Sequence, residues 1–110
     1  MNKEKFNNEL EQDEILEQVE IEVYAKQDKK PPRAKSYKIR IDKIKYDVKS
    51  ESISGRGLLE LTGKQPITNY RIDQKLRGGS TKKIELDEMV CLLTKGIERF
   101  MTLPLDQTEG

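Results

Sequence analysis

Hydrophobic and polar residues alternate in several short runs, and this period of two is the strongest structural signal in the chain. Residues 36–42 place three large apolar side chains on one face, and residues 44–48 place three more on the return. Such alternation is typical of half-buried strands. Only Asp42 and Lys43 separate the two runs, which predicts a tight turn and a β-hairpin whose inner face holds all six apolar groups.

A short helix is expected after this hairpin. Ser54 is a favourable N-cap residue, and Ile53 before it can pack on Leu58 as a hydrophobic staple. Leucines at positions 58, 59 and 61 supply a buried stripe, and Gly63 stands where a left-handed C-cap is expected. Glycines at positions 55 and 57 weaken the helix, so it should depend on packing against the hairpin.

Three further strands are expected, at residues 70–76, 89–93 and 97–103, with Gly78 and Gly79 forming the turn after the first of them. The pattern does not decide which face of the last strand is buried. Ile97 and Phe100 are three residues apart, so in a regular strand their side chains would point to opposite faces. A hairpin that covers one helix, with later strands added to its sheet, is an α+β domain. The simplest such fold is a β-grasp, in which the first and last strands pair in parallel at the centre.

A separate strand is predicted upstream. Alternation over residues 19–24 precedes Pro31-Pro32, which favours an extended linker. We therefore divide the chain into an arm and linker (1–35), a β-grasp domain (36–104) and a flexible tail (105–110). The arm is either disordered or a donor that adds to a sheet edge, its own or a neighbour's. Donation to a neighbour would make a homo-oligomer or filament, through Val19, Ile21, Val23 and Tyr24.

Composition limits what the domain can do. Apolar residues make up 34% of the chain, charged residues 37%, and the net charge is +1, so a small core is expected and no general attraction to nucleic acid or membrane. The charge is segregated: residues 1–23 hold two lysines and eight acids (net −6), and residues 24–45 hold nine basic residues and two acids (net +7). The two segments are either separately solvated or meet, within one chain or between neighbours.

The sequence does not indicate an enzyme, a metal site or a cofactor. It has no histidine, which excludes a Ser-His-Asp triad and argues against zinc, and no Gly-rich phosphate loop is found. Its single cysteine, Cys91, is interpreted as a small buried hydrophobe. No signal peptide or long apolar stretch is found, and with one cysteine this predicts a reducing cytoplasm.

The C-terminal residues suggest a different chemistry, in which other enzymes act on this protein. A glycine carboxylate can pass through a narrow channel, be adenylated and be transferred, so Gly110 is the expected conjugation residue, with a chance terminal glycine as the alternative. Leu76-Arg77-Gly78-Gly79 copies the letters at the end of ubiquitin, but apolar runs follow it, so it is interpreted as a turn. The expected tail for partner enzymes comprises Leu103, Pro104, Leu105, Asp106, Gln107, Thr108 and Glu109.

Several blocks together resemble the bacterial multiubiquitin domain. They are residues 37–43 (YKIRIDK), 54–63 (SGRGLLELTG), 70–72 (YRI) and above all 96–104 (GIERFMTLP), with weaker likeness at 24–26 and Pro31-Pro32. The resemblance implies a ubiquitin-like modifier that is joined through its C-terminus to target proteins. It further implies activating-enzyme-like, conjugating-enzyme-like and metallopeptidase partners, and a link to phage defence. Unlike the family's name, this chain holds one copy of the domain and no repeat.

Overall fold

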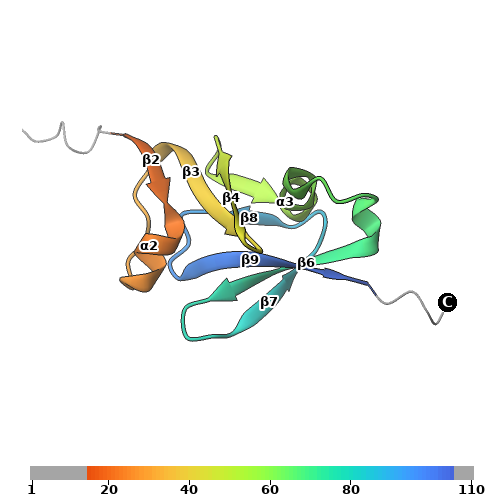
Figure 1. The fold of residues 1–110 in the computed structure, drawn as a ribbon. Coiled ribbons are helices and arrows are strands. Elements are labelled where there is room, and N and C mark those ends of the chain that lie inside the picture. Colours follow the sequence, from red (N-terminus) through yellow and green to blue (C-terminus); the bar gives the residue numbers. More distant parts are fainter. Residues whose placement is uncertain (1–14, 106–110) are drawn as a thin grey trace, which may run out of the picture.

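The computed structural model describes residues 15–105, which fold around one mixed sheet and a short crossing helix (Figure 1). In chain order its elements are β2 (Leu16–Glu20), α2 (Ile21–Lys26), β3 (Ala34–Ile41), β4 (Ile44–Val48), β5 (Ser52–Ser54), α3 (Gly55–Thr62), the 3-10 helix η1 (Ile67–Asn69), β6 (Tyr70–Leu76), β7 (Thr81–Ile84), β8 (Met89–Cys91) and β9 (Ile97–Pro104).

The centre of the sheet has the topology that the alternation predicts, but the predicted strand at residues 89–93, observed as β8, lies outside it. Its order is β2-β3-β9-β6-β7, with β4 paired to β3, and β9 lies parallel to β3 through Ile41 and Phe100. The first strand of the hairpin and the last strand are therefore central neighbours. This α+β arrangement is compatible with a ubiquitin-like β-grasp, as predicted.

The predicted hairpin is confirmed, except for one side chain. β3 and β4 pair antiparallel from Tyr37 opposite Val48 to Ile41 opposite Ile44. The three apolar residues of β3 are buried, but Ile44 is 59% exposed. It lies beside the turn, so the inner face of the hairpin buries fewer apolar groups than its pattern predicts.

The predicted strand at residues 19–24 is wrong from Ile21 onward. β2 does pair in parallel with β3, from Leu16 opposite Ala34 to Glu20 opposite Lys38. β4 pairs with one edge of β3, so β2 and β9 must both pair with the opposite edge. β2 occupies the first part of that edge, and β9 occupies it at Ile41. The chain therefore leaves the sheet after Glu20 and forms α2. The folded unit includes these residues, which the sequence pattern placed in the arm and linker.

Helix α3 forms as its caps predict. The Ser54 side chain accepts a hydrogen bond from the Gly57 N–H at 3.0 Å, and Gly63 closes the helix with a left-handed φ of 75°. Leu58 and Leu59 are fully buried in one core with the inner face of the sheet. The helix thus packs across the hairpin and the last strand, which is where a β-grasp places it.

Two short strands after the hairpin were not predicted by the pattern. Gly78 and Gly79 form the predicted turn, both with positive φ, but this turn leads into β7, which pairs with β6. β5 was also missed, and it forms a separate two-stranded sheet with β8. Both missed strands have four residues or fewer, too short for periodicity to reveal.

A register shift settles the facing of β9. Lys75 of β6 lies opposite Arg99, but the next residue, Leu76, lies opposite Ile97, so β9 has one extra residue there. An extra residue inverts the alternation locally. Ile97 and Phe100 can therefore both face the core despite their opposite parity, and both are buried.

Candidate functional site

The base of the predicted tail is held at one end of the sheet. Pro104 is the last ladder residue of β9, opposite Tyr70, and the Leu105 N–H donates a hydrogen bond to the Asn69 carbonyl at 2.9 Å. Leu103 and Leu105 remain 43% and 40% exposed. Two predicted tail residues therefore present apolar surface to solvent from an anchored position. Gly110 and the rest of the predicted tail, residues 106–109, lie outside the described residues.

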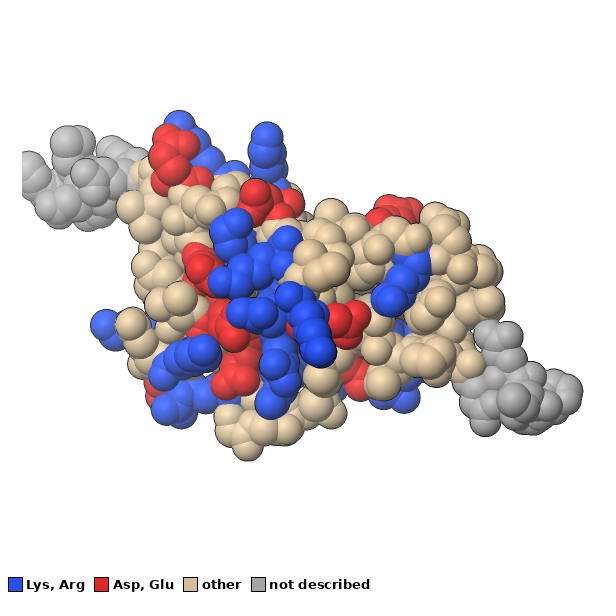
Figure 2. Space-filling view, in the orientation of Figure 1, with Lys and Arg blue, Asp and Glu red and all other residues tan. Residues whose placement is uncertain are grey.

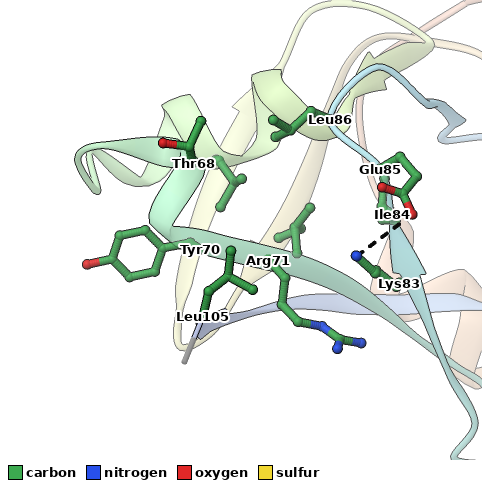
Figure 3. A pocket seen from close by; sticks show the side chains of 10 residues that line it. Thr68, Tyr70, Arg71, Lys83, Ile84, Glu85, Leu86 and Leu105 are labelled. Atoms are coloured by element: carbon green, nitrogen blue, oxygen red, sulfur yellow. Dashed lines mark ion pairs between the residues drawn. The ribbon is translucent and has the colours of Figure 1, made fainter. Parts of the chain in front are cut away.

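Leu105 lies at the mouth of a cavity of about 270 Å³ (Figure 3). Helix α3, η1, β6 and the end of β7 surround it, with buried Leu59, Ile72 and Ile84 among its lining. Figure 3 shows the side chains of Leu105, Tyr70 and Arg71 on one side of the cavity. The sequence pattern did not reveal this cavity, because its lining comes from four separate elements.

Arg71 is fixed at this mouth by a forked ion pair. Its Nε donates to Asp73 Oδ1 at 2.9 Å and its second guanidinium nitrogen to Oδ2 at 3.1 Å. The hydrogen bonds to Asp73, followed by the charge of that carboxylate, raise the pKa of Arg71. Asp73 is only 5% exposed, so the arginine covers an acid that would otherwise be buried without a partner. This ion pair could have been predicted from the sequence, because Arg71 and Asp73 are two residues apart and therefore lie on the same face of a strand.

A second charged contact holds the loop between β7 and β8, which contributes Leu86 to the cavity wall. Glu88 accepts from Lys82 Nζ at 2.6 Å and from the Glu85 backbone N–H at 3.0 Å. These two hydrogen bonds, the lysine first, lower the pKa of Glu88. The loop that carries Leu86 into the cavity wall is thereby tied to β7.

The predicted strand-donation residues lie within the chain's own fold. Val19 on β2 and Ile21 at the start of α2 are buried in the core. Val23 is 45% exposed on α2, and Tyr24 packs partly against the core. The four residues therefore do not form one strand, and the part that is a strand pairs with the same chain's β3.

The acidic and basic segments meet within one chain. Glu20 pairs with Lys45 at 2.5 Å, and Glu22 pairs with Arg40 at 3.0 Å. Of the two interpretations of the segregated charge, the described residues thus support the one in which the segments are in contact.

The interpretation of Cys91 as buried is wrong. It lies exposed on β8, because Val90 is the residue of that strand that faces inward. Within residues 15–105 no group of three or more acidic, histidine or cysteine side chains could hold a metal ion. In the same part of the chain, no helix is long and apolar enough to cross a membrane.

Comparison with known proteins gives one match. The model of the multiubiquitin family matches residues 37–104, more than half of the chain, from Tyr37 in β3 to the last residue of β9. No curated protein and no solved structure matches. The matched region holds the hairpin, α3 and the central parallel pair described above, and the chain therefore belongs to the multiubiquitin family.

Proposed function

We propose that this protein is a ubiquitin-like modifier of a bacterial pathway, activated and conjugated to target proteins through the carboxylate of Gly110. The proposal rests on its family and on one observation, the anchored exit of β9. The Leu105–Asn69 hydrogen bond fixes the point from which residues 106–110 continue. Five residues reach at most about 17 Å, enough for a terminal carboxylate to enter an enzyme's active site while the domain stays outside.

In this proposal the domain is handled by enzymes and is not itself an enzyme. An activating-enzyme-like protein would adenylate the carboxylate, a conjugating-enzyme-like protein would accept it, and a metallopeptidase would release it, in the cytoplasm and in phage defence. The exposed side chains of Leu103 and Leu105, beside the cavity and Arg71, would form the contact surface for these enzymes.

The test is a thioester assay with an activating-enzyme-like protein from the same genome. Incubation with that enzyme and ATP should give a covalent adduct by intact mass spectrometry, which an excess of free thiol cleaves by attack on the thioester carbonyl. Deleting Gly110 should abolish the adduct. The matched control is Arg77→Ala, which changes an exposed side chain in the internal Leu76–Gly79 stretch and keeps both turn glycines. Equal adduct from the Gly110 deletion and the parent protein would refute the proposal.

The alternative is a non-covalent module that self-assembles by donating β2 to a neighbour. It now requires a domain swap, because β2 pairs with its own β3. Light scattering of the full chain tests it, because a donated β2 requires at least a dimer. A monodisperse monomer would remove this alternative.

A further inference from the structure

Four basic side chains form one line across the outer face of the sheet, the face opposite α3. Arg40 on β3 lies opposite Lys45 on β4, and Arg99 on β9 lies opposite Lys75 on β6. The parallel register of β3 and β9 places Arg40 beside Arg99. We call these four residues the basic row. Figure 2 shows Lys and Arg side chains gathered in the middle of the view, where β3 and β9 lie in Figure 1.

Only half of the basic row is neutralised. Lys45 and Arg40 are paired with acids from β2 and α2. Arg99 and Lys75 have no ion-pair partner among the described residues, and Arg99 Nε is buried without a hydrogen bond there. Like charges directly opposite one another destabilise a sheet, and a buried donor without a partner adds to that cost. The β9–β6 half of the row therefore favours an added anion.

We infer that the acidic stretch Glu9-Leu10-Glu11-Gln12-Asp13 of a second copy binds along the basic row. Its acids stand at every second position, so in an extended segment all three side chains point the same way. Four steps of about 3.3 Å separate the first acid from the last, about 13 Å. Three strand spacings of about 4.8 Å separate the ends of the row, about 14 Å. The acids therefore span the length of the row, and the two cations without an ion-pair partner in the described part of the chain, Arg99 and Lys75, stand at one end of it.

The length of the chain assigns this segment to a second copy. β2 begins at the level of Ala34, six residues before Arg40, so the row lies about 20 Å from Leu16 along the strands. Asp13 is three residues from Leu16 and reaches about 10 Å, Glu11 reaches about 17 Å and Glu9 about 24 Å. Only Glu9 could touch the row of its own chain, so the three acids together can lie along the row only of another copy. Each copy carries one acidic segment and one row, so the contact is head-to-tail and extends into chains.

The inference does not depend on conjugation through Gly110, and it uses a different segment from strand donation. Sedimentation velocity of the full chain, from about 10 to 500 μM in low salt and again near 0.3 M salt, measures it. We expect association in low salt that weakens as salt rises. Lys75→Glu should weaken it about tenfold or more, equivalent to about 1.4 kcal/mol. Glu11→Lys, outside the described fold, should do the same.

Two further variants separate the inferred contact from a general effect of charge. Lys49→Glu makes the same charge change at an exposed position off the row and should leave association within about twofold of the parent. The double variant Glu11→Lys/Lys75→Glu restores opposite charges and should recover association. A monomeric parent protein in low salt would overturn the inference. So would equal losses from Lys49→Glu and Lys75→Glu, or no recovery in the double variant.

Discussion

Asp42 joins the β3–β4 turn to β9, and its removal tests how the centre of the sheet is held. The ladder between β3 and β9 has a single pair, Ile41 opposite Phe100. Beyond it, the Asp42 N–H donates to the Phe100 carbonyl at 2.8 Å. The Asp42 carboxylate accepts two more hydrogen bonds, from the Thr102 N–H at 2.9 Å and the Thr102 hydroxyl at 2.6 Å.

The expected cost of Asp42→Ala combines two effects. A hydrogen bond to a charged group contributes about 1.5–3 kcal/mol, and we take about 2 kcal/mol for this partly buried pair of bonds as a unit. Asp42 also has a φ of 57°, which costs alanine about 1 kcal/mol more. The sum is about 3 kcal/mol, which for a domain of this size lowers Tm by about 12 °C or more.

Urea and thermal unfolding of four variants separates these effects. Asp42→Gly should be about 1 kcal/mol less destabilising than Asp42→Ala, because glycine adopts positive φ freely. Thr102→Val and the double variant with Asp42→Ala complete a cycle, whose expected coupling is about 1 kcal/mol. If Asp42→Ala stays within about 0.5 kcal/mol of the parent, or the two changes are additive, the carboxylate does not hold the strands together.

Three other predictions concern the parts of the fold around the candidate site. Ile21→Ala should destabilise the protein by about 2–5 kcal/mol in urea unfolding, whereas Val23→Ala should change it by under about 0.5 kcal/mol; equal effects would contradict the placement of α2. Arg71→Ala uncovers the buried Asp73 carboxylate and should lower the urea midpoint, and an unchanged midpoint would contradict a stabilising role for the ion pair. Glu88 has a lowered pKa because of Lys82, so its stabilising contribution is present above the ordinary carboxyl range and is lost as the pH falls through the lowered pKa. Glu88→Gln should therefore reduce the loss of stability between about pH 7 and pH 3, and an unchanged pH profile would refute this.

The elements predicted correctly are those specified by neighbouring residues. The β3–β4 hairpin follows from alternation around a two-residue turn, and α3 follows from Ser54 and Gly63 at its caps. In each case the residues that decide the conformation lie within one turn or one ladder step of it. The multiubiquitin resemblance rests on local sequence blocks, and the family match confirms it over residues 37–104.

The elements predicted wrongly depend on contacts between distant parts of the chain. Residues 19–24 alternate like a strand, yet Ile21 and Ala25 also stand four residues apart and are both buried on one face of α2. The helix forms because β9, about eighty residues later in the chain, pairs with the edge of β3 that a longer β2 would need. The extra residue in β9 is likewise visible only in its register with β6. Such choices are made by tertiary pairing, which local periodicity does not encode.

The two proposed functional ends are placed so that they need not compete. β2 begins at one end of the domain and β9 leaves at the opposite end, beside η1 (Figure 1). The basic row crosses the sheet between them, through Arg40 and Arg99, whereas the cavity at Leu105 lies on the far side of Tyr70. A copy bound along the row would therefore leave the anchored base of the tail accessible. Chains of this protein could be assembled first and conjugated afterwards, and an adduct assay on Lys75→Glu would show whether conjugation proceeds equally well without assembly.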